Sequence, residues 1–251
     1  LVFGGDGADM LRGAAGMDTL RGGAGDDDLR GSAGDDWMHG NDGQDRLDGG
    51  TGHDTLHGGA DADTLSAGSG ADWLDGGDGD DLLLGGAGAD RAMGGVGNDQ
   101  VYAGSSDDTL HGGAGNDSLG ASSGSDAASG GAGDDRLWGG SGHDWLAGDD
   151  GDDSLYGSNG NDTLAGGAGD DLIWTGSGAD LVLLRDPGHD VIADFNPLAD
   201  RLDLRALEIT GLAALEWSQE DAGVLLMLDP GSTVLLTGVT QGDLDAGDFL
   251  F

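Results

Sequence analysis

The protein has 251 residues, of which 49 are Asp or Glu and only 9 are Lys or Arg, so its formal net charge is −40. This acidity excludes a nucleic-acid partner, which needs a basic surface, and it disfavours binding to an anionic membrane. Cysteine is absent, which excludes disulfides and thiolate metal sites, and no apolar run is long enough for membrane insertion.

A strict repeat begins at Gly4 and ends at Leu183, where the sequence divides into twenty nonapeptides without an insertion. The fourth position is Gly in 18 of the 20 repeats, and the eighth is always apolar, with Leu in 14 of them. A fixed short period predicts a repeat architecture rather than the disorder that acidity and 56 glycines would otherwise indicate. The sixth position is Asp in every repeat: Asp9, Asp18, Asp27, Asp36, Asp45, Asp54, Asp63, Asp72, Asp81, Asp90, Asp99, Asp108, Asp117, Asp126, Asp135, Asp144, Asp153, Asp162, Asp171 and Asp180.

Each position of the nonapeptide has a physical interpretation. Glycines at positions 1, 2 and 4 permit positive φ angles and leave the backbone carbonyls accessible, so the first six residues are expected to form a tight turn. The last three residues alternate polar, apolar and polar, which predicts a short strand with one inward side chain.

Parallel strands need a connection of about a dozen residues, so one six-residue turn is too short and repeat n should pair with repeat n+2. The sequence therefore predicts an all-β fold, a parallel β-roll with two nonapeptides per coil and leucines packed between two sheets. We expect this roll over residues 1–183 and a small C-terminal β cap over residues 184–251.

Two leucines per coil are too few to offset the conformational entropy of eighteen glycine-rich residues, and stacking the coils also aligns the aspartates. The roll therefore needs a cation, and carboxylate and carbonyl oxygens match Ca²⁺ better than Mg²⁺. Twenty repeats provide at most 18 intervals between turn n and turn n+2. Calcium in all of these intervals would nearly neutralise the net charge of residues 4–183, which contain 36 Asp and 6 Arg.

The nonapeptide resembles the GGxGxDxUx repeat of the RTX (repeats-in-toxin) calcium-binding proteins, over residues 4–183. The resemblance implies a right-handed parallel β-roll with Ca²⁺ between successive turns. It also implies that the twenty sixth-position aspartates are metal ligands, with turn carbonyls completing the coordination.

Three even-numbered repeats depart from the pattern. Repeat 14 lacks Gly at its first two positions and places Ala128 inward, repeat 12 has Ser106 instead of Gly, and repeat 10 has Ala92 inward. We expect thin packing there and loosely held ions beside Asp108 and Asp126.

The period stops after Leu183. Residues 187–207 resemble the segment that follows the repeats in serralysin-type proteases and alginate epimerases. Residues 223–239 predict two strands around a turn at residues 229–232. The terminal Asp248-Phe249-Leu250-Phe251 is similar to the uncleaved C-terminal signal of bacterial type I secretion, and it could equally form the last strand of the cap.

These features predict a bacterial protein that is secreted without a cleaved N-terminal signal peptide, through the ABC transporter of a type I secretion system. The acidic chain would stay unfolded in low-Ca²⁺ cytosol and fold in millimolar extracellular Ca²⁺. We expect no enzyme site in this chain, because Gly120–Gly124 matches G-x-S-x-G but joins no strand to a helix. Any catalytic activity would then lie upstream in a larger protein.

Two alternatives use outward-facing side chains. A column of Tyr102, Trp138, Tyr156 and Trp174 could bind polysaccharide or a second chain, as an adhesive or surface-layer module would, but coverage by the cap is the simpler interpretation. His39 and His57 should be neighbours, and a surface Zn²⁺ or Ni²⁺ contact there competes with simple solvation. Ice binding is disfavoured, because position 3 contains a single Thr.

The acidic stretch Gly22–Gly31 illustrates the prediction. Asp27 is the expected ligand, whereas Asp26 and Asp28 occupy the variable positions 5 and 7. We expect those two aspartates to contribute only outward-facing charge.

Overall fold

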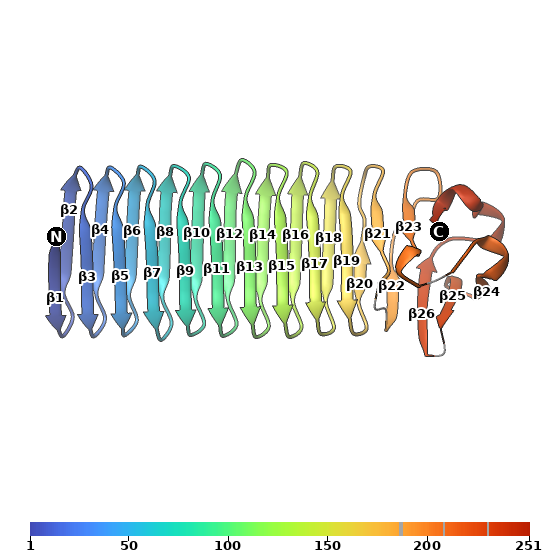
Figure 1. Ribbon diagram of the computed structural model, residues 1–251, viewed down its shortest axis with the longest axis horizontal. Helices are drawn as coiled ribbons and strands as arrows, with labels where there is room; N and C mark the ends of the chain where they lie inside the picture. Colours follow the sequence, from blue (N-terminus) through green and yellow to red (C-terminus); the bar gives the residue numbers. More distant parts are fainter. Residues whose placement is uncertain (186–187, 208, 230) are drawn as a thin grey trace. The chain divides into compact units, whose positions relative to one another are not determined.

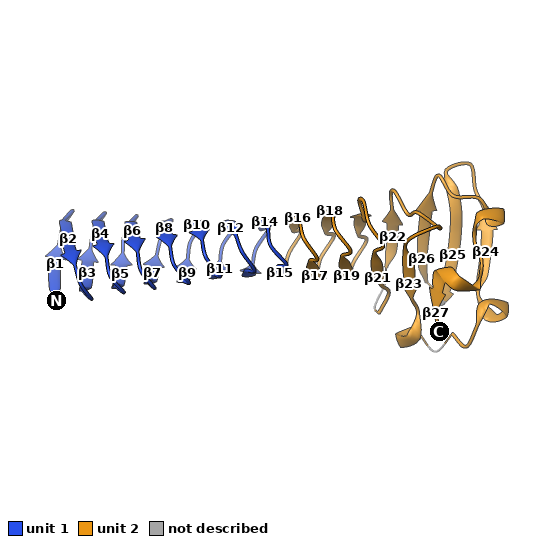
Figure 2. Cartoon of the chain, turned by 90° about the horizontal axis from the view of Figure 1, so that it is seen from above, with its two compact units in different colours: residues 1–127 blue, residues 128–251 orange. Residues whose placement is uncertain are grey.

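The computed structural model describes residues 1–185, 188–207, 209–229 and 231–251 (Figure 1). The chain divides into two compact units, Leu1–Ala127 and Ala128–Phe251 (Figure 2). Both are almost entirely β, and the only helical elements among the described residues are four 3₁₀ turns of three residues each. No described segment forms a helix that is long and apolar enough to cross a membrane. The predicted boundary between the roll and the cap, at residues 183 and 184, stays a prediction.

The first unit consists of parallel β-solenoid coils. Its odd-numbered strands form one sheet in the order β1-β3-β5-β7-β9-β11-β13, and its even-numbered strands form the other, from β2 to β14. The strands are β1 (Val2–Asp6), β2 (Met10–Ala15), β3 (Thr19–Ala24), β4 (Asp28–Ala33), β5 (Trp37–Asp42), β6 (Arg46–Thr51), β7 (Thr55–Ala60), β8 (Thr64–Ser69), β9 (Trp73–Asp78), β10 (Leu82–Ala87), β11 (Arg91–Val96), β12 (Gln100–Ser105), β13 (Thr109–Ala114) and β14 (Ser118–Ser123).

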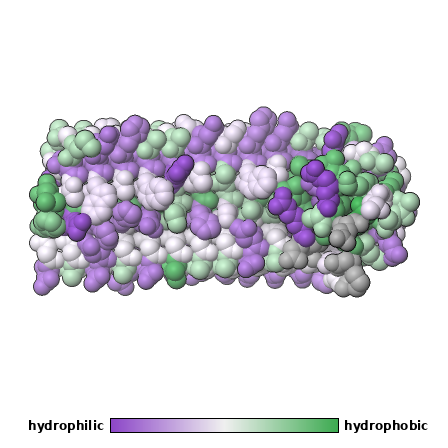
Figure 3. Space-filling model, in the orientation of Figure 1, coloured by the Kyte–Doolittle hydropathy of each residue, from purple (hydrophilic) through white to green (hydrophobic). Residues whose placement is uncertain are grey.

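The register confirms the pairing of repeat n with repeat n+2. Leu20 of β3 lies opposite Met38 of β5, and Leu29 of β4 lies opposite Leu47 of β6, each pair 18 residues apart. All four side chains are completely buried, so the eighth position forms the core between the two sheets. Hydrophilic side chains gather along the edges where the turns lie (Figure 3).

The strands are longer than the sequence analysis expected. Each regular strand has six residues, positions 7–9 of one repeat and positions 1–3 of the next, so only positions 4–6 turn the chain. The glycines permit this extension, because a Cβ on Gly23 would collide with the carbonyl oxygen of Gly5 in the preceding coil. They serve close backbone approach within the sheet as much as they serve the turn.

The second unit continues the coils and adds the cap. Its strands are β15 (Ala127–Ala132, beginning at the last residue of the first unit), β16 (Arg136–Ser141), β17 (Trp145–Asp150), β18 (Ser154–Asn159), β19 (Thr163–Ala168), β20 (Leu172–Trp174), β21 (Leu181–Leu183), β22 (His189–Ile192), β23 (Arg201–Asp203), β24 (Glu216–Gln219), β25 (Gly223–Asp229), β26 (Ser232–Thr237) and β27 (Phe249–Leu250). The 3₁₀ turns are η1 (Arg205–Leu207), η2 (Leu212–Ala214), η3 (Gln241–Asp243) and η4 (Ala246–Asp248).

The cap grows directly from the two sheets. β22 pairs in parallel with β20, and β23 with β21, so the coils continue past the last nonapeptide. β25 and β26 form the predicted antiparallel hairpin, although Pro230 of its expected turn lies outside the described residues. β27 pairs with β23, and Phe249 is buried, which confirms the C-terminus as the last strand of the cap.

Candidate calcium site

The sixth-position aspartates lie where each turn enters the next strand, and the fold buries nearly all of them. The side chains from Asp27 to Asp180 are between 1 and 4 % exposed, whereas Asp9 and Asp18 of the first coil are half-buried. Ionised carboxylates are rarely buried to this extent without a partner.

One oxygen of each carboxylate bonds to the neighbouring coil. The backbone N–H of Asp45 donates to Asp63 Oδ1 at 2.7 Å, and that of Asp63 donates to Asp81 Oδ1 at 2.7 Å. The even-numbered repeats contain the same ladder, for example from Asp54 to Asp72 at 2.7 Å. The structure thus brings each row of predicted ligands together at the strand spacing, one row for each set of turns.

The other oxygen, Oδ2, is buried and receives no hydrogen bond from the described chain. An unsatisfied buried polar atom is costly, and a charged one more so. This applies to Asp9, Asp27, Asp36, Asp45, Asp54, Asp63, Asp72, Asp81, Asp90, Asp99, Asp108, Asp153, Asp162, Asp171 and Asp180. A row of such atoms indicates that a group other than this chain completes the site.

Burial also changes the acidity of these groups. Loss of solvent, with a smaller contribution from neighbouring aspartates, raises the pKa of Asp63 and Asp99 to about 7 and that of Asp45 to about 6. The backbone N–H bonds oppose this effect but do not overcome it. Without a cation the protein therefore resists ionising the row, and a bound cation would reverse that preference.

Carboxylate and carbonyl oxygens lie close together beside the glycine at position 1. A Cβ on Gly85, at position 1, would lie 2.6 Å from Asp90 Oδ2 and 2.6 Å from the carbonyl oxygen of Ala103. The corresponding point at Gly4 is 2.6 Å from both Asp9 Oδ2 and the carbonyl oxygen of Gly22. Calcium accepts carbonyl oxygens beside carboxylates. A larger residue at either glycine would collide with both oxygens, so glycine there lets a carboxylate and a carbonyl from adjacent coils approach each other.

Backbone oxygens must supply much of the coordination. No three His, Asp or Glu side chains within the described parts of the chain are grouped so that they could hold a metal ion by themselves. The predicted set of ligands, position-6 carboxylates and turn carbonyls, suits a hard cation of flexible geometry. The assignment of the individual sixth-position aspartates as ligands stays a prediction.

The structure extends both rows beyond the repeats, to residues that the sequence analysis missed. Asp171 N donates to Asp190 Oδ1 at 3.2 Å, and Asp180 N donates to Asp200 Oδ1 at 3.1 Å. The offsets of 19 and 20 residues conceal this continuation from a strict search for period nine. The signal was Gly188-His189-Asp190, which repeats the tripeptide Gly52-His53-Asp54 of a regular turn.

The even row ends on a carboxylate that the protein itself satisfies. Asp200 Oδ2 accepts hydrogen bonds from Thr175 Oγ1 at 3.1 Å and from Asn196 N at 2.8 Å. Asp200 is 2 % exposed, as deeply buried as the repeat aspartates. Thr175 of the last repeat and Asn196 of the cap therefore supply the hydrogen bonds that the corresponding oxygen lacks at Asp63.

Position 5 forms a second ladder, which corrects the expectation for Asp26. Asp26 Oδ1 accepts a hydrogen bond from Gln44 N at 3.0 Å, and Asp35 Oδ1 accepts one from His53 N at 2.8 Å. Asp28 is different, because it forms only an exposed ion pair with Arg30 at 3.0 Å. Asp26 therefore links successive turns, whereas Asp28 contributes surface charge as expected.

The degenerate repeats keep the ladder geometry. Asp108 N donates to Asp126 Oδ1 at 2.7 Å, and Ala92 and Ala128 are buried at 3 and 2 % exposure. Loose ion binding beside Asp108 and Asp126 stays a prediction.

The outer histidines behave as expected neighbours. The rings of His39 and His57 lie 5.7 Å apart, and His57 Nδ1 is 3.3 Å from Asp75 Oδ2. Burial, followed by the charges of His57 and Arg21, lowers the pKa of His39. Ser122 of the G-x-S-x-G match lies inside β14, so it does not form a turn between a strand and a helix.

The predicted aromatic column forms in the second unit. The rings of Trp138 and Tyr156 are 5.6 Å apart, those of Tyr156 and Trp174 are 4.5 Å apart, and both pairs are nearly parallel. Trp138 remains 39 % exposed, so the expectation that the cap buries the column is wrong at this residue. Tyr102, in the first unit, leans over Gly120.

The fold and its rows of buried carboxylates define a calcium-binding repeat protein. The RTX calcium-binding nonapeptide repeat matches residues 3–38, 21–56, 57–92, 84–119, 120–155 and 148–182. Because these matches cover most of the chain, the protein belongs to this family, and the sequence-based recognition is confirmed. Comparison with curated proteins gives no match.

Solved structures of similar proteins include two repeat subunits and two larger proteins. The AlgE6R3 subunit of the Azotobacter vinelandii mannuronan C5-epimerase is 34 % identical, with 48 % of this chain and 79 % of that chain covered and a TM-score of 0.41. The extracellular lipase LipA of Serratia marcescens is 19 % identical, and the match covers 93 % of this chain and 40 % of the lipase, with a TM-score of 0.39. A Ca²⁺-dependent β-helical antifreeze protein from an Antarctic bacterium is 22 % identical, and the match covers 80 % of this chain and 65 % of that protein, with a TM-score of 0.35.

Proposed function

We propose that this chain is a secreted calcium-binding module that folds when it binds Ca²⁺ outside the cell. The observation that supports it most strongly is the row of buried Oδ2 atoms without hydrogen bonds. Metal-free coils bring these carboxylates together at a cost, and the net charge of −40 opposes compaction further. Calcium would remove both penalties, so its binding energy becomes folding energy.

Circular dichroism of the purified chain tests the coupling. We expect little β signal at pH 7.5 in buffer treated with a chelating resin, and a cooperative gain at millimolar Ca²⁺. Magnesium at the same concentration should give much less, because it keeps its waters and demands rigid octahedral geometry. An equal β signal with and without Ca²⁺ would show that the fold does not depend on the ion.

We further propose that calcium-dependent folding supports the export and stability of a larger protein through a type I secretion system. The acidic, unfolded chain would remain suitable for transport in low-Ca²⁺ cytosol. Phe249 is buried in the cap, whereas Phe251 stays 37 % exposed, so folding covers part of the predicted signal after export. The test is export of the chain from cells that have a type I transporter. Deletion of residues 248–251 should abolish export of chain that is still synthesised.

We propose no catalytic role for this chain and no polysaccharide site on its aromatic column. The exposure of Trp138 favours a sugar site, but the geometry of the rings opposes it. Because the rings of Trp138, Tyr156 and Trp174 stack face to face, each covers the surface that a sugar ring would use. The column acts as a ladder that stabilises neighbouring coils.

A further inference from the structure

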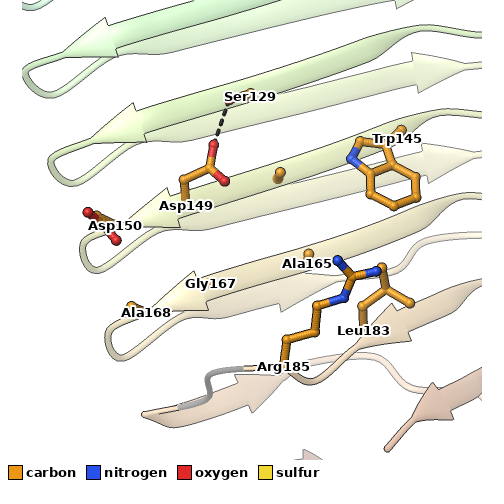
Figure 4. Close-up of a pocket in the computed structure, with 10 residues that line it drawn as sticks. Ser129, Trp145, Asp149, Asp150, Ala165, Gly167, Ala168, Leu183 and Arg185 are labelled. Atoms are coloured by element: carbon orange, nitrogen blue, oxygen red, sulfur yellow. Dashed lines mark hydrogen bonds between the residues drawn. The ribbon is translucent and has the colours of Figure 1, made fainter. Parts of the chain in front are cut away.

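A shallow pocket of about 480 Å³ lies on the sheet face that includes β15, β17, β19 and β21, within residues 128–251 (Figure 4). None of the sixth-position aspartates lines it. Its volume falls in the range of about 300–1,000 Å³ that is typical of small-molecule sites. The pocket therefore needs an explanation separate from calcium binding.

Two small side chains in register create the floor. Ala147 of β17 lies opposite Ala165 of β19, and both occupy position 9 of their repeats. The same position contains larger residues in other even-numbered repeats, such as His57 and Met93. Adjacent alanines therefore leave a hollow where the rest of the column is filled.

Trp145 provides an open aromatic wall. Its side chain is 45 % exposed, and among the described residues it contacts no other aromatic ring. This distinguishes it from Trp138 and Trp174, whose rings stack against Tyr156. A free indole face packs well against the CH groups of a sugar ring.

Arg185 provides the positive charge. Its side chain is exposed, and Figure 4 shows the guanidinium extending over the sheet beside Ala165 and Leu183. No described carboxylate lies within 4.0 Å of it, although the protein has 49 acidic residues. Arg205 chiefly, and Arg185 at longer range, lower the pKa of Asp203, but no described carboxylate forms an ion pair with the Arg185 guanidinium. Such a guanidinium binds carboxylates through paired hydrogen bonds.

Asp149 provides an acceptor for hydroxyl groups. Ser129 Oγ donates to Asp149 Oδ2 at 2.5 Å, whereas Oδ1 makes no hydrogen bond with the described chain. Asp149 is the only charged residue at position 2 in the twenty repeats, and it adopts a φ of 80° that favours glycine. Other non-glycine residues at position 2, such as Ser32 and Ser158, share this positive φ, so it follows from the coil and leaves the side chain exposed on the sheet face.

We propose that this pocket binds a pyranose ring that carries a carboxylate, such as a uronate residue of an acidic polysaccharide. The ring packs on Trp145 above the alanine floor, Asp149 accepts hydrogen bonds from ring hydroxyls, and Arg185 pairs with the carboxylate. A carboxylate suits the site better than a phosphate, because a second negative charge would be repelled by Asp149 and Asp150.

Methyl β-D-glucuronide and methyl β-D-glucoside form a matched pair of probes for ligand-observed NMR or calorimetry on the full chain in Ca²⁺. We expect millimolar binding of the glucuronide and at least tenfold weaker binding of the glucoside. Arg185→Gln should abolish this preference, and Trp145→Thr should abolish both interactions. Thr occupies the equivalent position in β19 as Thr163, so the fold should tolerate it.

Two further variants separate the pocket from its surroundings. Trp138→Thr removes a ring of the aromatic column and should leave glucuronide binding unchanged. Asp149→Gly restores the usual residue and should weaken both probes at least threefold while leaving circular dichroism unchanged.

Absence of saturable glucuronide binding to the folded chain overturns the proposal, as does equal loss of binding in Trp138→Thr and Trp145→Thr. Equal binding of the two probes overturns the carboxylate assignment. Circular dichroism of the same samples separates these results from a failure of calcium-dependent folding, because only the latter changes the dependence of the β signal on Ca²⁺.

Discussion

The repeats and the cap place the same buried aspartate in opposite circumstances. Asp63 in the repeats and Asp200 in the cap are each 2 % exposed and each accept a backbone N–H through Oδ1. Asp63 Oδ2 has no hydrogen-bond partner in the described chain, whereas Asp200 Oδ2 accepts hydrogen bonds from Thr175 and Asn196. Burial alone does not make an ion site, because only the repeats leave the second oxygen unsatisfied.

Acidity shows the same contrast. Burial raises the pKa of Asp63 to about 7, whereas the Arg205 guanidinium lowers the pKa of Asp203 in the cap. Hydrogen bonds from Thr240 likewise lower the pKa of Asp243. The repeat aspartates therefore favour the neutral form, whereas Asp203 and Asp243 are held charged. Asp190, which continues a repeat row into the cap, resembles the repeats, because burial raises its pKa to about 7.

Removal of calcium should produce the largest difference between the two regions. We expect amide hydrogen exchange to lose protection throughout residues 4–183 at pH 7.5, while the β25–β26 hairpin loses it last. The hairpin buries Val224, Leu226 and Val234 completely and has no row of unsatisfied carboxylates. Simultaneous loss of protection in both regions would mean that the cap depends on the ions as strongly as the repeats do.

pH should shift the two regions in opposite directions. The raised pKa values of the repeat aspartates, about 6 to 7, mean that the metal-free folded state binds more protons than the unfolded state between about pH 4 and 7. Metal-free repeats should therefore lose stability as pH rises through that window. Asp203 and Asp243 have lowered pKa values, so their contribution is present above about pH 4 and is lost below it.

Circular dichroism of metal-free protein between pH 4 and 8 measures this effect. We expect more β signal at pH 4.5 than at pH 7.5 without calcium, and weaker apparent Ca²⁺ affinity at the lower pH, because protons compete for the same carboxylates. A metal-free β signal that increases with pH would contradict the assignment of the raised pKa values to the repeats.

A single neutral substitution should separate folding from ion binding. Asp63→Asn removes a buried charge, so metal-free stability at pH 7.5 should stay the same or increase. The calcium midpoint should rise on the order of tenfold, because a charged ligand is lost. Asp61→Asn is the matched control in the same turn, where the side chain is exposed, and it should change neither quantity appreciably. Equal shifts in both variants would indicate a general charge effect.

Much of this contrast could be predicted from sequence, because a period of nine residues determines which side chains align. The core leucines, the pairing of repeats n and n+2 and the buried row from Asp27 onward follow from that period. Asp190 and Asp200 were missed because one or two inserted residues break the period without breaking the register. Trp145 and Asp149 lie on β17 and Arg185 follows β21, so only the structure shows that all three line one pocket.

The smallest predicted effect concerns the acidic stretch at Asp26 and Asp28. Asp26→Ala should lower the free energy of unfolding of the Ca²⁺-loaded protein by about 0.5–1.5 kcal/mol, because Gln44 N loses its acceptor. Asp28→Ala should change it by less than about 0.5 kcal/mol, because an exposed ion pair contributes little. Asp26→Asn retains an acceptor oxygen and should restore most of the loss in denaturant unfolding. If Asp28→Ala were as destabilising as Asp26→Ala, net charge rather than the hydrogen bond between turns would explain both.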